Sequence, residues 1–155
     1  MRWFCYLALA CLSVVSAHTF ADETQIKQAC TDLVLDYAFY RDRLDAEPYA
    51  QLFAEDAVLT VLGQVFQGRV AIKKRMLESK DGPVTRHMMS TIRIFPIDSH
   101  SASGVSYVTV YSAPAGELPL KVEQFLGLGE YHDKFVLTEQ GWKISRRTFV
   151  PVFMN

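Results

Sequence analysis

The chain has 155 residues, of which 50% are hydrophobic and 21% are charged, and its formal net charge is −1 at pH 7. This length suits one domain with a real core, and the composition excludes a disordered or fibrous chain. Because the net charge is nearly neutral, it does not indicate the excess of positive charge that is typical of nucleic-acid-binding proteins. The one basic cluster, Lys73-Lys74-Arg75, spreads around the axis of a predicted helix, so we interpret it as a solvated face.

The N-terminus predicts a signal peptide over residues 1–21. An apolar run of about 15 residues follows Arg2, which is short of the ~20 residues that span a bilayer. Small residues favour cleavage after Ala17 or Ala21. We therefore expect residues 22–155 to form a single periplasmic or secreted domain that has no membrane attachment after cleavage. An uncleaved membrane anchor is the alternative.

An apolar periodicity predicts the first helix of the mature chain over Thr24–Arg43. Its main apolar side is formed by Ile26, Cys30, Leu33, Tyr37, Tyr40 and Leu44. A second apolar patch, formed by Leu35, Ala38 and Phe39, lies on the opposite side. A helix that is apolar on two sides is covered on both sides, or it walls a cavity.

The cysteines predict no internal disulfide. Cys5 and Cys11 leave with the signal peptide, and Cys30 then stands alone. Because Cys30 falls on the main apolar side of the first helix, we expect a buried and unreactive thiol.

Two shorter helices and a series of strands follow. Asp45 is expected to cap a short helix that runs to about Phe53, and Gly68 opens a third helix over Arg69–Ser79. The strand predictions are a hairpin, Ala57–Leu62 with Val65–Gln67, and four longer strands, Thr85–Phe95, Ala102–Ala113, Val122–Leu137 and Gly141–Phe153. Helices followed by an antiparallel meander predict an α+β domain with the helices packed on one face of the sheet.

Asp42 is an unusual residue for the end of the first helix. On the helical wheel it lies in line with the second apolar patch, where a buried carboxylate without a partner would cost several kcal/mol. A negative charge at a helix C-terminus also opposes the helix dipole. An imidazole N–H could satisfy this carboxylate, and the other ring nitrogen would then face the cavity as a base. The alternative is an exposed Asp42 paired with Arg41 or Arg43.

The order and spacing of several short motifs resemble a known family. The motifs are "YRDRLD", "YAQLFAEDAVLTVLGQVFQGRVAI", "TRHMMSTIRI", "GVSYVTVY" and "GLGEYHDKFVLTEQGWKISRR". Together they resemble the SnoaL-like branch of the nuclear transport factor 2-like superfamily, over roughly residues 24–150. The resemblance implies a cone-shaped, curved antiparallel sheet, a cystatin-like α+β roll, with the N-terminal helices on its concave face around an apolar pocket. Because such folds include both enzymes and binding proteins, the fold alone does not give a function.

The resemblance also implies a site. In the branch that contains scytalone dehydratase and hexachlorocyclohexane dehydrochlorinase, an aspartate orients a histidine that removes a proton from the substrate. Asp42 and His87 match these positions, and Arg147 matches an arginine in the pocket. The chain departs from the pattern at Tyr37, where the dehydrochlorinase has a lysine, and at Thr91, where many relatives have an asparagine. The group that would assist the leaving group therefore stays open.

Other residues are expected to line the pocket or to compete with this interpretation. The predicted substrate-binding residues are Tyr37, Phe53, Met89, Tyr107 and Tyr131, and the three tyrosines are also candidates for the acid. His87 could instead be a satisfied core or surface histidine. Arg147 could instead pair with Asp133 or Glu130 across the sheet. Strict alternation places Arg147 on the face opposite Ile144, so its entry into a pocket would require either a bulge or a pocket on that face.

Three functions are compatible with these features. The first is a cofactor-free lyase or isomerase that acts on a small hydrophobic substrate, and the second is a protein that binds such a ligand without catalysis. The third is an interaction module whose outer sheet face forms a hetero-complex or, as we expect, a homodimer, and exposed strand residues such as Val108 and Val110 would suit this surface. The four histidines are scattered, so the segment Tyr131-His132-Asp133 does not indicate a metal site. We expect no metal, cofactor or nucleic-acid partner.

Overall fold

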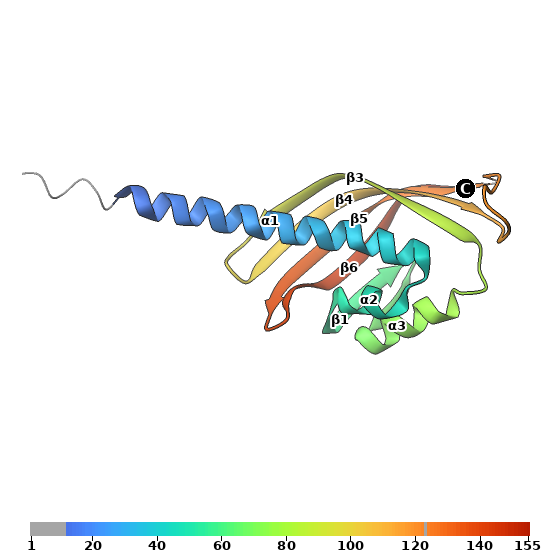
Figure 1. Cartoon of the computed structure of the whole chain (residues 1–155), viewed down its shortest axis with the longest axis horizontal. Coiled ribbons are helices and arrows are strands. Elements are labelled where there is room, and N and C mark those ends of the chain that lie inside the picture. Colours follow the sequence, from blue (N-terminus) through green and yellow to red (C-terminus); the bar gives the residue numbers. More distant parts are fainter. Residues whose placement is uncertain (1–11, 123) are drawn as a thin grey trace, which may run out of the picture.

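The computed structural model describes residues 12–122 and 124–155 and shows helices lying against one face of a curved sheet (Figure 1). The elements are α1 Leu12–Arg43, α2 Ala46–Gln51, β1 Phe53–Val61, β2 Gln64–Gln67, α3 Arg69–Glu78, β3 Val84–Pro96, β4 Ser101–Ala113, β5 Gln124–Thr138 and β6 Gly141–Met154. The predicted α+β class is confirmed. Of the predicted signal peptide, residues 1–11 lie outside the described residues, and residues 12–21 continue α1 as helix. No helix within the described ranges is long and apolar enough to cross a membrane.

The strands form one open sheet in the order β2-β1-β6-β5-β4-β3. Strands β3 to β6 form the predicted antiparallel meander, but β1 pairs with β6 in parallel. The sheet is therefore mixed and not wholly antiparallel. The reason is topological: the meander starts at the edge strand β3, and its last strand arrives beside β1 running in the same direction. This places β6 in the middle of the sheet, where its inner side chains are buried.

Strands β5 and β6 depart from regular pairing at two places, a bulge in β6 and a close approach at Gly129 in β5. In β6 the pairing passes from Lys134↔Arg146 to Phe135↔Ile144, so Ser145 forms a bulge. Ile144 and Arg147 are consequently both fully buried on the same face. In β5, a Cβ on Gly129 would lie 2.5 Å from both Cε2 of Phe149 and the backbone oxygen of Val150. This position therefore requires glycine because β6 approaches it with both its backbone and an aromatic ring.

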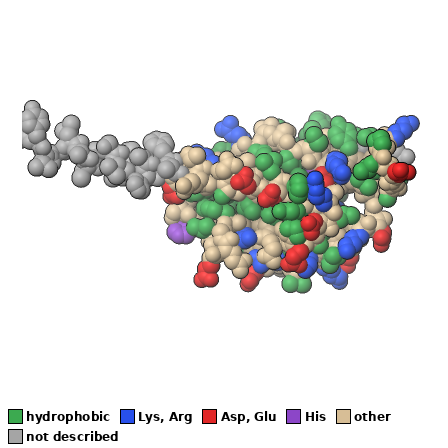
Figure 2. Space-filling view, in the orientation of Figure 1, with side chains coloured by type: hydrophobic (Ala, Val, Ile, Leu, Met, Phe, Trp, Pro, Cys, Tyr) green, Lys and Arg blue, Asp and Glu red, His purple; other side chains and the backbone are tan. Residues whose placement is uncertain are grey.

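Helix α1 packs its main apolar side on the sheet, and residues such as Cys30 and Tyr37 are buried in the core. The second apolar patch is only partly covered. Ala38 is buried, but Leu35 and Phe39 are 46% and 49% exposed. Figure 2 shows that hydrophobic and charged side chains are interspersed on the face that it draws. The expectation that α1 would be covered on two sides is therefore wrong for these two residues.

The turn between β1 and β2 leads to a stability prediction. Leu62 and Gly63 both have positive φ, 49° and 79°, between the paired residues Val61 and Gln64. This is a two-residue turn that favours Asn-Gly, whereas leucine is strained in this conformation and Leu62 is exposed. We expect Leu62→Asn to raise the free energy of unfolding by about 1 kcal/mol, measured by urea denaturation. The same change at Leu77, an exposed leucine of α3, should lower stability because asparagine is the poorer helix former.

Candidate active site

The end of α1 places Asp42 beside β3. The helix stops at Leu44, which has φ 56°, and the backbone N–H of Asp45 donates to the carbonyl of Tyr40 at 3.1 Å. This left-handed residue turns the chain sharply after the last helical turn. The predicted side-chain cap from Asp45 to α2 is not formed. Arg86 ties the helix end to β3 by donating to the carbonyl oxygens of Asp42, at 3.4 Å, and Thr85, at 2.7 Å.

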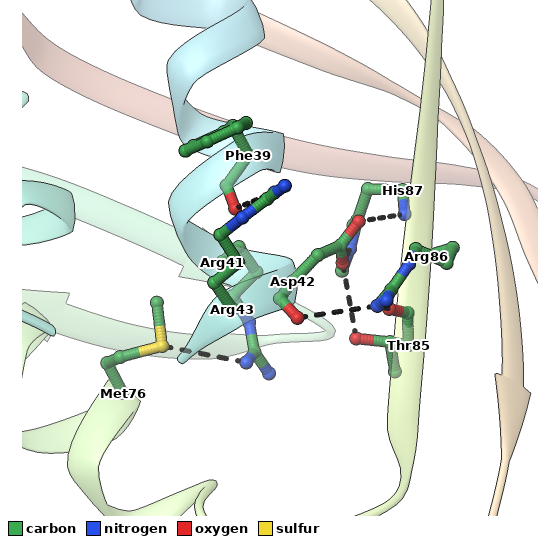
Figure 3. A network of polar contacts seen from close by, with 8 residues as sticks. All are labelled: Phe39, Arg41, Asp42, Arg43, Met76, Thr85, Arg86 and His87. Atoms are coloured by element: carbon green, nitrogen blue, oxygen red, sulfur yellow. Dashed lines mark hydrogen bonds and ion pairs between the residues drawn. The ribbon is translucent and has the colours of Figure 1, made fainter. Parts of the chain in front are cut away.

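The predicted contact between Asp42 and His87 is present (Figure 3). His87 Nδ1 lies 2.6 Å from Asp42 Oδ1, and the backbone N–H of His87 donates to Oδ2 at 2.8 Å. The two side chains are only 8% and 10% exposed, respectively. Arg41 and Arg43 contact Met76 Sδ and the Phe39 carbonyl instead. The alternative of an exposed Asp42 paired with a neighbouring arginine is therefore wrong.

This geometry fixes the chemistry of the imidazole. Because a carboxylate only accepts hydrogen bonds, Nδ1 of His87 donates to Asp42, and Nε2 of the neutral ring is then the unprotonated nitrogen. No hydrogen bond to Nε2 is formed by any residue in the described part of the chain. The arrangement can therefore take up a proton at Nε2 while Asp42 stabilises the resulting imidazolium.

A hollow of about 460 Å³ opens at the end of β4, and neither Asp42 nor His87 is among its lining residues. Its lining residues are Asp81, Gly82, Pro83, Ser112, Ala113, Pro114, Ala115 and Leu126. Ser112 pairs with Thr85, whose hydroxyl donates to Asp42 Oδ1 at 3.4 Å, and His87 pairs with Val110 two residues further along. Thr85 therefore links Asp42 to the edge of the hollow, and His87 lies two rows of strand pairing away from it.

Arg147 is fully buried and engaged by Asp133, which was one of the two partners predicted across the sheet. Its Nε and Nη2 donate to the two carboxylate oxygens at 2.8 and 2.7 Å. Its guanidinium carbon lies 4.1 Å from the ring centroid of Tyr37 and 4.5 Å from that of Tyr131. Burial alone would lower the pKa of Arg147, but Asp133 outweighs it and raises this pKa. Arg147 is therefore a permanent, paired cation behind the tyrosine rings.

Comparison with known proteins now identifies the family. The model of the SnoaL-like domain family matches residues 21–148. The chain belongs to the SnoaL-like domain family. No curated protein matches the chain.

Solved structures similar to this SnoaL-like domain carry related descriptions. One, provisionally described as a scytalone dehydratase from Novosphingobium aromaticivorans, has 24% identity and a TM-score of 0.75, and the match covers 88% of this chain and 90% of that chain. A Mycobacterium tuberculosis protein of unknown function has 26% identity and a TM-score of 0.73, with 86% and 76% covered. LinA has 16% identity and a TM-score of 0.72, with 87% and 91% covered. At these identities the first and third comparisons show the fold alone.

The other predicted pocket residues of this SnoaL-like domain fall into two groups. Tyr37, Phe53 and Tyr131 are buried in the core, with edge or tilted ring contacts among them. Met89 lies on the inner face of β3, two residues from His87, and packs against the core. Tyr107 points the other way, because its neighbour Val108 is fully buried while Tyr107 is 40% exposed. We therefore place Tyr107 outside the pocket.

One buried residue escaped the sequence analysis. Tyr49 on α2 is fully buried, and its ring lies 5.2 Å from Tyr37 and 5.5 Å from Phe53. The signal was present, since Ala46, Tyr49 and Phe53 follow the spacing of one helix face, but the helix was too short to stand out. Within the described residues, no group of three or more potential ligands could hold a metal ion.

The buried thiol and phenols of the SnoaL-like domain predict a loss of stability at alkaline pH. Burial, and secondarily the charge of Asp133, raise the pKa of Cys30 from 9.0 to about 12. Burial likewise raises the pKa values of Tyr49 and Tyr131 well above 10.0. Above pH 9 the unfolded chain loses these protons before the native state does, so the free energy of unfolding falls as pH rises.

For Cys30 alone, this fall approaches about 1.4 kcal/mol per pH unit between its two pKa values. Urea denaturation across this alkaline range measures it. In Cys30→Ala the free energy of unfolding should fall less steeply with pH, and the remaining fall should come from Tyr49 and Tyr131. Identical slopes for Cys30→Ala and wild type would contradict the assignment.

Proposed function

We propose that this SnoaL-like protein is exported and binds a small hydrophobic molecule, from which His87 abstracts a proton without a cofactor. The observation that carries the proposal is the Asp42–His87 pair. Its 2.6 Å contact is nearly buried, it fixes the tautomer, and it leaves Nε2 free within the described residues. The enzyme-like descriptions of similar structures, a scytalone dehydratase and LinA, support a pocket protein of this kind.

The proposed step is a proton transfer from carbon to nitrogen. His87 Nε2 accepts the proton, and the electron pair of the broken C–H bond either expels a leaving group or moves to a neighbouring position. The first course gives a lyase, and the second, with return of the proton elsewhere, gives an isomerase. Asp42 stabilises the imidazolium, and Arg147 acts as a fixed positive charge behind Tyr37 and Tyr131, which stay the candidate acids.

A ligand carrier without catalysis is the second candidate. It is favoured by the pairing of Arg147 with Asp133, because this pairing leaves the arginine largely neutralised. Either function is proposed for a homodimer that associates through the outer sheet face. Val108 is fully buried and Val110 packs against the core, so the two valines predicted for that surface do not contribute to it. Tyr107 and Tyr111, both exposed on β4, take their place in the proposal.

Native mass spectrometry of protein purified from its own host tests binding and association together. We expect the mass of two protein copies, each retaining a small hydrophobic molecule that is released on denaturation. A ligand-free monomer at all protein concentrations would contradict both parts of the proposal. A ligand found on a monomer would contradict the dimer alone.

A further inference from the structure

A second hollow lies in the seam between α1 and the edge strand β3, away from the Asp42–His87 pair. Its volume is about 500 Å³, which is a size typical of small-molecule sites. Thr31, one of its lining residues, lies about 16 Å before Asp42 along α1. The lining residues are Lys27 and Thr31 from α1 and Ile92, Arg93, Ile94, Phe95 and Pro96 from β3.

This hollow begins directly after a bulge in β3. The pairing of β3 with β4 shifts between Ser90 and Arg93, and Thr91 has φ 49°. A β-branched residue is strained in this left-handed conformation, and a bulge bends the strand that carries it. Beyond the bulge, Ile92 and Ile94 pack against the core. Because strained backbone is concentrated at functional sites, the strain at Thr91 supports a role for the adjoining hollow.

The hollow carries positive charge that no carboxylate of its lining balances. Lys27 and Arg93 are cationic, and no lining residue in the described part of the chain is acidic. The guanidinium group of Arg93 forms no hydrogen bond, ion pair or ring contact with the other described residues. Lys27 contacts Glu23 at 3.2 Å, but both side chains are at least half exposed, and such a pair contributes little. The two cations therefore favour a ligand with a negative charge.

The rest of the lining is mainly apolar. Ile92 and Ile94 are half-buried, and the Phe95 side chain is 47% exposed. Thr31 is half-buried and adds one hydroxyl that can donate a hydrogen bond. A ligand that uses the whole hollow therefore combines an anionic end with an apolar chain.

An extended peptide is a less suitable occupant. The outer edge of β3 has no neighbouring strand in the sheet, so it could in principle pair with such a peptide. The bulge at Thr91 interrupts this edge, however, and Pro96 has no N–H to donate. Only the short run 93–95 is regular between them, which favours a small molecule over an added strand.

We propose that the seam between α1 and β3 binds a small monocarboxylate with an apolar chain. Its carboxylate contacts the ammonium group of Lys27 and the guanidinium group of Arg93, which can both donate charge-assisted hydrogen bonds. Its chain packs on Ile92, Ile94 and Phe95. The site is additional to the proposed reaction and does not depend on it.

Calorimetric titration with sodium octanoate, 1-octanol and sodium acetate tests the site. We expect saturable binding of octanoate. Octanol keeps the chain without the charge and acetate keeps the charge without the chain, so each should bind at least tenfold more weakly. The double variant Lys27→Gln/Arg93→Gln, which changes only exposed side chains, should bind octanoate at least tenfold more weakly than wild type. Lys74→Gln, at a lysine of α3 that is 75% exposed, should bind like wild type.

Amide shifts in NMR spectra locate the bound octanoate independently of the variants. They should change at Lys27, Thr31 and residues 92–95, while His87 stays unaffected. The proposal is overturned if octanoate does not bind, if octanol binds as tightly, or if the double variant keeps the affinity of wild type. Shift changes centred on His87 would place octanoate at the proposed reaction site and would equally refute a site in the seam.

Discussion

Replacing Asp133 with asparagine is expected to lower the free energy of unfolding by about 3–5 kcal/mol. The change removes the negative charge but keeps the size of the side chain. Arg147 is fully buried and always charged, so it would remain as an uncompensated cation in the core. Its stacking between Tyr37 and Tyr131 prevents the guanidinium from turning toward water. Urea denaturation of the purified variant measures the loss.

Two comparisons separate a buried charge from general damage to the core. Asp133→Leu combined with Arg147→Met removes both charges and should recover most of the stability, because a buried ion pair contributes little beyond apolar packing. Glu130→Gln breaks the exposed contact with His132, which spans 2.8 Å, and should cost no more than about 1 kcal/mol. If Asp133→Asn were as mild as Glu130→Gln, the ion pair would be hydrated and not buried.

Replacing His87 with alanine is expected to lower kcat on the retained ligand by about 10²- to 10⁴-fold. The variant removes the proposed base and leaves the fold of β3 intact, since the backbone N–H of His87 still donates to Asp42. Asp42→Asn should also lower kcat, because an amide can donate to Nδ1 and select the wrong tautomer. Steady-state assays with the ligand identified by mass spectrometry measure both effects.

The chain provides a matched control for this prediction. His132 also contacts a carboxylate, Glu130, but its side chain is 51% exposed. His132→Ala should leave kcat unchanged, since this histidine is solvated and pairs with a residue of the same strand. A comparable fall in kcat for His132→Ala would point to a general effect of losing a histidine and would contradict the role of His87.

The sequence predicted the Asp42–His87 contact and offered Asp133 as one partner of Arg147, but it did not predict that Arg147 would be fully buried. Asp42 was recognisable because it interrupts an apolar patch at a helix end, and the resemblance supplied its partner. Periodicity gives the side of a strand only while the strand is regular. The bulge at Ser145 exchanges the two faces of the sheet for the residues that follow it, so Arg147 lies on the buried inner face. Nothing in the local pattern marks Ser145 as the bulge.

Long-range pairing was equally invisible in the sequence. The elements themselves, from α3 to β6, lie close to their predicted bounds because turn residues and alternation are local signals. That β6 runs beside β1 in parallel depends on the path of the whole meander. Leu35 and Phe39 illustrate a similar point, because they are exposed although the apolar patch predicted that they would be covered. An apolar patch on a helix indicates that something covers it, but it does not show that the covering residues belong to the same domain.

The central claim is that His87 removes a proton from carbon, and exchange with D₂O tests it most directly. The ligand is incubated in D₂O with wild type, His87→Ala or His132→Ala, and deuterium in the recovered ligand or product is measured by mass spectrometry. We predict that wild type and His132→Ala either incorporate deuterium at one carbon or convert the ligand to an elimination product, and that His87→Ala does neither above background. Equal exchange or conversion by wild type and His87→Ala, or neither by any protein, would contradict proton abstraction by this residue.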